Sequence, residues 1–71
     1  MGLAPMTEAM RVETARTAFA AITGALEGSA VVAAEGQANP KLSSARQSYD
    51  RLIVLLEATI ARLQRLRRLL G

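Results

Sequence analysis

The chain has 71 residues, the length of a single domain, and a domain of this size buries only about 60% of the surface that its unfolded chain exposes. It contains no cysteine and no histidine, which excludes disulfides, thiolate and imidazole metal sites, and Cys/His or Ser/His/Asp catalysis. The net charge of +3 combines −2 over residues 1–40, with two arginines and four glutamates, and +5 over residues 41–71, with seven basic and two acidic side chains. This asymmetry favours antiparallel pairing of the two halves. Because so small a chain has no disulfide or metal to stabilise it, we also expect an oligomer or a protein partner.

The first residues carry no recognisable targeting signal. Residues 1–5 lack the basic region of a signal peptide, and position 6, where a myristoylated chain has Ser or Thr, is Met6. The absence of cysteine fits a reducing compartment. We therefore expect a cytoplasmic protein.

A first helix is predicted for about residues 7–35. Thr7 is a suitable N-cap, and Glu8 in the first turn interacts favourably with the positive end of the helix dipole. Apolar residues at three-four spacing predict the side of this helix that packs: Val12, Ala15, Phe19, Ile22, Leu26, Ala30 and Ala33.

Residues 24–35 allow two interpretations. In the first, which we favour, Gly24 and Gly28 belong to a small-residue face that admits another backbone, and the helix is continuous. In the second, the helix ends near Gly28, and residues 29–34 form a connecting segment or a short strand, because Val31 and Val32 favour extended structure.

A loop is predicted at residues 36–40. Gly36 is a typical helix-ending residue, Asn39 can accept a hydrogen bond from a backbone N–H of the next helix, and Pro40 suits a first helical position. The second helix is predicted for residues 40–70. The expected fold class is therefore all-α, an antiparallel two-helix hairpin that forms one domain over residues 1–71.

The second helix carries the strongest periodic signal in the chain. Residues at three-four spacing predict one stripe that packs against another helix, as in a coiled coil: Leu42, Ala45, Tyr49, Leu52, Leu56, Thr59, Leu63, Leu66 and Leu70. Near its middle, Ile53, Leu55 and Ile60 broaden the stripe beyond what one neighbouring helix covers. This broadened band predicts a partner-binding surface formed by Tyr49, Leu52, Ile53, Leu55, Leu56, Ile60 and Leu63.

The carboxylates do not indicate an enzyme. Catalytic carboxylates must converge in a cleft, whereas those of this chain are scattered singly along both predicted helices. A two-helix hairpin also lacks a concave pocket of the usual size. We expect neither catalytic activity nor a cofactor or metal.

Two segments suggest other partners. Residues 17–34 are uncharged apart from Glu27, which raises the alternative of a membrane-spanning helix. Because many of these residues are alanine or glycine, their transfer into a membrane is only weakly favourable, and a soluble helix is favoured. Residues 62–70 are basic and amphipathic, as in membrane-surface or nucleic-acid contacts. Because arginines in the last turns also interact favourably with the helix dipole, neither partner is expected.

The second helix resembles a known family. Residues 45–51 (ARQSYDR), followed by residues 55–61 (LLEATIA), are similar to the Gln/aromatic stretch and the Leu-Glu-Ala-x-Ile pattern of the small co-chaperones of the type III secretion needle subunit. The resemblance covers residues 39–63. It implies a cytoplasmic helix pair that joins a larger helical-repeat chaperone and keeps the needle subunit monomeric until export. The glycine-containing first helix and the basic C-terminus depart from the family.

Two alternatives remain at the level of sequence. Asn39, Pro40 and Leu42 at the start of the second helix also resemble the needle subunit itself, which implies a self-assembling structural protein. A phage head or tail joining protein is the other alternative, and it is favoured if residues 29–34 form a strand.

Overall fold

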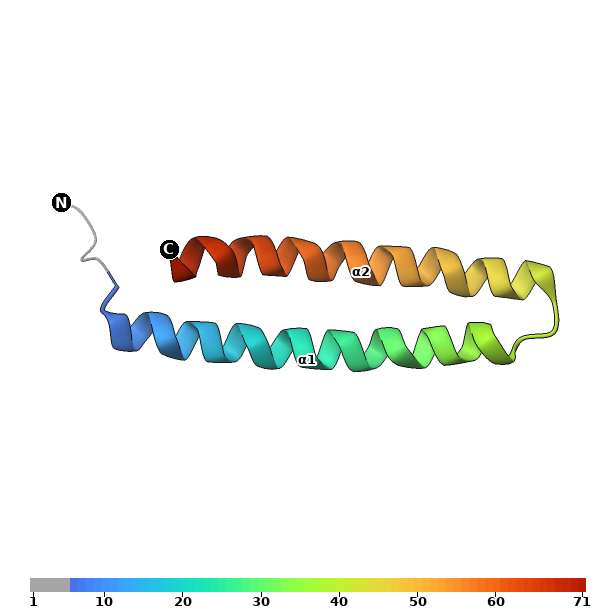
Figure 1. Ribbon diagram of the computed structural model, residues 1–71, viewed down its shortest axis with the longest axis horizontal. Coiled ribbons are helices and arrows are strands. Elements are labelled where there is room, and N and C mark those ends of the chain that lie inside the picture. The colour runs from blue at the N-terminus through green and yellow to red at the C-terminus, as the bar shows by residue number, and fades with distance from the viewer. Residues whose placement is uncertain (1–5) are drawn as a thin grey trace.

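The computed structural model describes residues 6–71 as an antiparallel hairpin of two long helices (Figure 1). Helix α1 spans Glu8–Ala38 and helix α2 spans Leu42–Leu70. The molecule is a rod of 58 × 19 × 17 Å, with one end formed by the loop and the other by the start of α1 and the end of α2. The predicted all-α hairpin is confirmed, and the expectation about targeting signals in residues 1–5 lies outside the described residues.

Helix α1 begins with the N-cap that the sequence predicts. The Thr7 backbone is extended, and its Oγ1 accepts a hydrogen bond of 3.1 Å from the Met10 backbone N–H. Glu8 follows in the first turn, where the helix dipole favours a carboxylate. The cap therefore satisfies one of the N–H groups that the first turn of a helix leaves without a partner.

Helix α1 is continuous through residues 24–35, so the continuous interpretation is confirmed and the strand is wrong. The predicted reason is also wrong, because a Cβ atom added at Gly24 or Gly28 would meet nothing within 4 Å. These glycines face open space. The helix also passes Gly36, the predicted stop, and ends at Ala38. At Gly36 the helices are close, since an added Cβ atom would lie 3.2 Å from the Ser48 Cβ atom.

The loop between the helices is shorter than predicted. The side-chain Oδ1 of Asn39 accepts a hydrogen bond of 3.1 Å from the Lys41 backbone N–H, which lies just before the helix rather than inside it. Pro40 is not helical, and α2 begins at Leu42 with Lys41 as its N-cap. Asn39 thus stabilises the turn, and its backbone N–H donates back to the Gly36 carbonyl at 3.4 Å.

The helices meet along a seam of mostly small side chains, which we define as the buried and half-buried residues that recur at three-four spacing on each helix. On α1 these are Ala15, Ala18, Ile22, Ala25, Ser29, Val32 and Gly36. On α2 they are Ala45, Ser48, Leu52, Leu55, Thr59, Leu66 and Leu69. The spacing runs from Ala15 to Gly36 on α1 and, apart from exposed Arg62, from Ala45 to Leu69 on α2, so the two helices pack along most of their length.

The apolar core within this seam is small. Its buried cluster, Ala15, Ile22 and Leu66, lies toward the end of the rod away from the loop. The buried polar side chains, Ser29 and Thr59, each donate a hydrogen bond of 2.9 Å to the carbonyl four residues earlier. Among the described residues no buried side-chain polar atom lacks a partner, so the seam is satisfied although it buries little apolar surface.

The predicted packing stripes are only half right. On α2, Ala45, Leu52, Thr59 and Leu66 do pack in the seam. The other predicted members are exposed: Leu42, Tyr49, Leu56, Leu63 and Leu70. The seam instead uses the residues one position earlier, such as Ser48, Leu55 and Leu69.

Helix α1 shows the same difference of one position. Ala15 and Ile22 are buried, whereas Val12, Phe19 and Leu26 are exposed. The predicted members Ala30 and Ala33 are exposed as well. Small residues such as Ala18, Ala25 and Ser29 lie in the seam instead. Because they let the two backbones approach closely, the bulkier side chains lie outside the seam.

Candidate functional site

Most of the exposed large apolar side chains gather along one long edge of the hairpin, which we call the apolar edge, although Met10, Val31 and Val54 are exposed outside it. It follows from the seam, because in an antiparallel pair the residues one position after the seam on α1 and on α2 lie on the same side. Its members, with exposed fractions of 37–88%, are Val12, Phe19 and Leu26 of α1 and Leu42, Tyr49, Ile53, Leu56, Ile60, Leu63 and Leu70 of α2. The apolar edge therefore runs the length of the rod.

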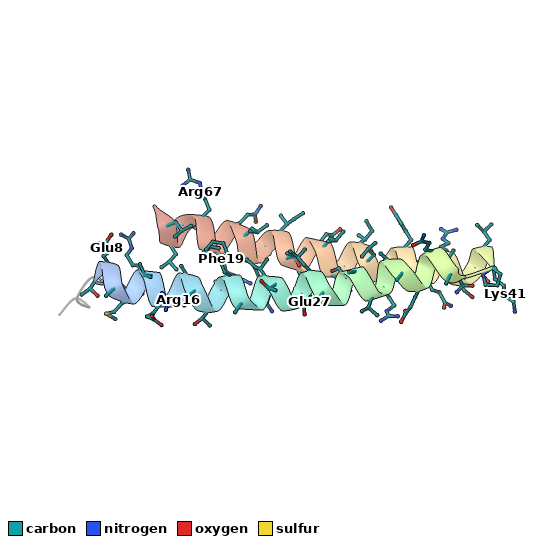
Figure 2. The ribbon with its side chains drawn as sticks, turned by 60° about the horizontal axis from the view of Figure 1, so that its bottom comes forward. Glu8, Arg16, Phe19, Glu27, Lys41 and Arg67 are labelled. Carbon is teal, nitrogen blue, oxygen red and sulfur yellow. The ribbon has the colours of Figure 1, made fainter. Side chains whose placement is uncertain are left out.

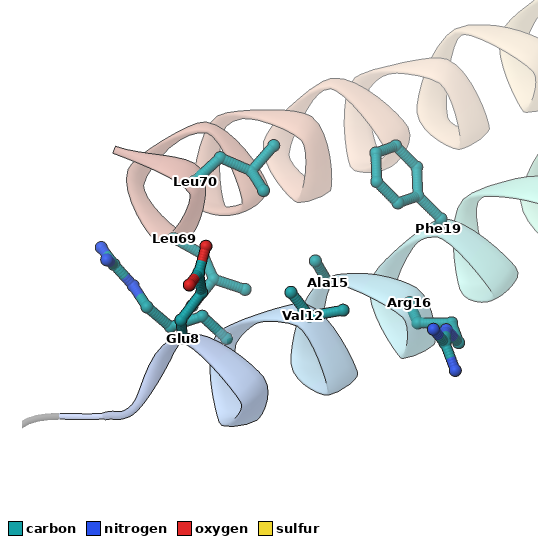
Figure 3. Close-up of a pocket in the computed structure, with 8 residues that line it drawn as sticks. Glu8, Val12, Ala15, Arg16, Phe19, Leu69 and Leu70 are labelled. Carbon is teal, nitrogen blue, oxygen red and sulfur yellow. The ribbon is translucent and has the colours of Figure 1, made fainter.

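A groove marks the end of the apolar edge near the termini (Figure 3). It has a volume of about 460 Å³ and is lined by apolar side chains from both helices, including Val12, Phe19 and Leu70. Figure 3 shows the Phe19 ring standing up from α1 toward the side of α2, with Leu70 approaching from the other helix. Glu8, Arg11 and Arg16 complete the lining, so the groove is apolar at its base and charged at its margin.

The residues predicted to bind a partner divide into two groups. Tyr49, Ile53, Leu56, Ile60 and Leu63 are all exposed on the apolar edge. Leu52 and Leu55 are half-buried in the seam, where they contribute to holding the two helices together. The structure thus brings most of the predicted surface together on one side of α2.

The contribution of α1 to this surface was missed at the level of sequence. The sequence predicts Val12, Phe19 and Leu26 for the packing side of the first helix, yet about half of each residue is exposed. Their seven-residue interval matches that of Leu56, Leu63 and Leu70 on α2. Matched seven-residue intervals of bulky residues on both helices are the signal that could have found them.

The opposite long edge is different in character. Its residues are small or polar. Glu35 of α1 and Arg51 of α2 form an ion pair there at 3.5 Å, which is the one ion pair between the helices in the described part of the chain. A second groove on that side is lined by Thr14, Arg62 and Arg65 together with seam residues such as Leu66 and Leu69. Large apolar side chains are therefore concentrated on one edge rather than distributed around the rod.

The charged side chains of the described residues all lie on exposed positions. Glu27 of α1 and Arg67 of α2 point away from the opposite helix (Figure 2). Glu13 pairs with Arg16 of its own helix at 3.2 Å, and both side chains are exposed. Within residues 6–71 no three acidic side chains gather in a way that could hold a metal ion.

Within the described part of the chain, α1 is the one helix whose length and composition would allow it to cross a membrane. Its most apolar window has a mean hydropathy of 1.4. Glu27 lies within that segment and is exposed. Core helices of soluble proteins and signal sequences have the same composition, so the feature alone does not assign a location.

Comparison of the chain with models of protein families, with curated proteins and with solved structures finds no match.

Proposed function

We propose that the chain is a non-enzymatic, protein-binding helical hairpin that acts as a chaperone or assembly factor and binds through the apolar edge. The observation that carries this proposal is the exposure of Phe19, Leu56, Leu63 and their neighbours along one edge. Soluble proteins rarely leave a continuous apolar patch of this length in water unless another surface covers it.

The small core supports the same proposal. The buried cluster of Ala15, Ile22 and Leu66 removes little apolar surface from water for a chain of 71 residues. With no cysteine and no histidine, neither a disulfide nor a His/Cys metal site stabilises the fold. A partner that binds only the folded hairpin adds the missing stability by mass action.

The resemblance of residues 39–63 to needle-subunit co-chaperones gives the proposal its specific form. In that form the hairpin joins a helical-repeat chaperone in the cytoplasm and helps to hold a needle-type subunit before export. The alternative is a self-assembling structural subunit, either needle-like or a phage head or tail joining protein, in which the apolar edge binds further copies of the chain. The joining protein has lost the strand at residues 29–34 that would have favoured it.

Site-specific photo-crosslinking in cells separates these possibilities. A photo-reactive phenylalanine at position 63 lies on the apolar edge, where Leu63 is 45% exposed. The matched control position is 54, because Val54 is 66% exposed on a different side of the same helix. We expect a discrete heterologous product from position 63 and none from position 54.

The identity of the cross-linked protein decides the outcome. A helical-repeat chaperone or a secreted helical subunit at position 63 supports the proposal. Crosslinks to the same chain alone contradict it and favour the structural subunit. A salt-insensitive monomer in light scattering, with no crosslink from position 63, contradicts both.

A further inference from the structure

The apolar edge is bordered by arginines. On α2, the outermost column of the edge contains Ile53 and Ile60, and the same seven-residue spacing continues to Arg46 on one side of them and Arg67 on the other. On α1, the corresponding column contributes Arg16 near the groove. In the described residues neither of these two columns holds a carboxylate, although Glu8 lies at the end of the groove.

These arginines remain available to a partner. Arg67 donates one hydrogen bond of 2.6 Å to the Gly71 carbonyl, and a guanidinium has five N–H donors. Arg16 pairs with Glu13 at 3.2 Å, but the two side chains are about 70% exposed, and such a pair is weak in water. The α2 border of the apolar edge thus carries a positive charge at each end, at Arg46 and Arg67, whereas on the α1 side Arg16 is paired with Glu13.

The charge of this border disfavours a second copy of the chain. A second hairpin placed on the edge brings the same arginines and adds a further net charge of +3. Like charges at the margin of an interface suppress a partner, whereas opposite charges increase its affinity and fix its register. A partner with carboxylates on either side of an apolar stripe is complementary to the edge.

The shape and size of the edge suit a single helix. Two antiparallel helices leave a groove between them into which a third helix packs. From Leu42 to Leu70 the edge is about 42 Å long at 1.5 Å per residue. With exposed fractions of 37–88%, its side chains leave on the order of 1,000 Å² to water, and one partner in a stable complex buries about 800 Å².

We propose that the apolar edge binds one amphipathic helix of a partner protein whose apolar stripe is flanked by carboxylates that contact Arg46 and Arg67. The two arginines are about 31 Å apart along α2 at 1.5 Å per residue, which corresponds to roughly six helical turns. The partner helix therefore carries acidic residues near both of its ends. This inference rests on the proposed function and names the chemistry of the partner.

Synthetic helical peptides test the proposal on the full chain. One peptide of eight turns carries leucines at three-four spacing with glutamates beside them, and the second is identical except that lysines replace the glutamates. We expect the glutamate peptide to bind at low salt about tenfold more tightly than the lysine peptide, since each exposed ion pair contributes a modest amount. Fluorescence anisotropy with labelled peptides measures both.

Charge reversal supplies the decisive variants. Arg46→Glu combined with Arg67→Glu is expected to reverse the order of the two peptides. The matched control is Arg51→Glu combined with Arg65→Glu, which makes the same change in net charge on the opposite edge and is expected to keep the original order. Arg46→Gln with Arg67→Gln removes the charges without adding new ones and is expected to abolish the preference. Circular dichroism confirms that each variant is folded.

The outcomes distinguish this proposal from the proposed function. Equal binding of both peptides to the natural chain overturns the acidic partner helix but leaves an edge that binds proteins. Binding of neither peptide, with self-association that Leu63→Asp abolishes, overturns both. Binding of neither peptide, with edge-dependent sedimentation on phosphatidylserine vesicles, overturns both in favour of a membrane surface.

Discussion

A Cβ atom added at Gly36 would lie 3.2 Å from the Cβ atom of Ser48, so the helices approach each other closely beside the loop. Two turns earlier in α1, a Cβ atom added at Gly28 would meet nothing within 4 Å. The two glycines therefore have different roles. Gly36 gives the second helix room, whereas Gly28 lowers the stability of its own helix without a packing benefit.

We expect Gly28→Ala to raise the free energy of unfolding by about 0.5–1 kcal/mol, the usual difference between glycine and alanine in a helix interior. Gly36→Ala is expected to gain less than this, or to lose stability, because the new methyl group must displace Ser48. Urea unfolding followed by circular dichroism measures both. Equal gains would show that α2 can move away from α1 at no cost.

Leu66 and Leu63 are one turn apart on α2 and differ in burial, with exposed fractions of 4% and 45%. Leu66→Ala is expected to lower the free energy of unfolding by about 2–5 kcal/mol, because it leaves a cavity in the buried cluster. Leu63→Ala is expected to cost about 1 kcal/mol or less. A similar loss of stability for both variants in thermal unfolding would contradict the assignment of Leu66 to the seam and Leu63 to the apolar edge.

The sequence predicts the two helices better than it predicts how each is rotated about its own axis, which decides the side that packs in the seam. Thr7, Asn39 and the three-four spacing are local signals, and the hairpin follows from them. The choice between Leu55 and Leu56 for the seam is not local, because both continue the same spacing. It depends on how closely the opposite helix can approach, and the alanines of α1 decide it.

The candidate site shows the same division. The excess of apolar residues around Ile53 and Ile60 is visible in the sequence and correctly indicates an exposed band on α2. The place of Phe19 is harder to predict, because the same residue fits a packing side equally well and only its seven-residue spacing, matched on α2, indicates the edge. The sequence does not separate a seam from an edge one position away, and it therefore also predicts the seam residues Leu52 and Leu55 for the binding surface.

Ile53 and Leu56 are almost equally exposed, at 38% and 37%. The sequence alone places Leu56 in the packing stripe, so that its replacement by aspartate would unfold the chain. The structure instead leads us to expect that Ile53→Asp and Leu56→Asp retain helicity alike and weaken partner binding alike. Val54→Asp is the matched control, and circular dichroism with the crosslinking assay measures both effects. Loss of helicity in Leu56→Asp alone would return Leu56 to the seam.

Thr59 is 4% exposed, and its Oγ1 donates a 2.9 Å hydrogen bond to the Leu55 carbonyl. The Leu55 carbonyl also accepts the α-helical hydrogen bond from the Thr59 backbone N–H, so Thr59→Val leaves no buried polar group without a partner. We expect the free energy of unfolding to stay unchanged or to rise by up to about 1 kcal/mol. Thr23→Val is the exposed control, since Thr23 makes the same bond to the Phe19 carbonyl. A large loss confined to Thr59→Val would assign the hydroxyl a further role in the seam.

Glu35 and Arg51 form the ion pair between the helices at 3.5 Å, with more than half of each side chain exposed. A double-mutant cycle with Glu35→Gln and Arg51→Gln is expected to give a coupling energy of about 0.2–1 kcal/mol at low salt, because water screens an exposed pair. Near 1 M salt, where the screening length is about 3 Å, the coupling is expected to vanish. The pair Glu13 and Arg16 within α1 is the control, since its coupling stabilises a helix and not the contact between helices. A coupling that persists at high salt would mean that Glu35 and Arg51 hold the hairpin together by packing rather than by charge, and their neighbours near the loop would then have to be counted as part of the seam.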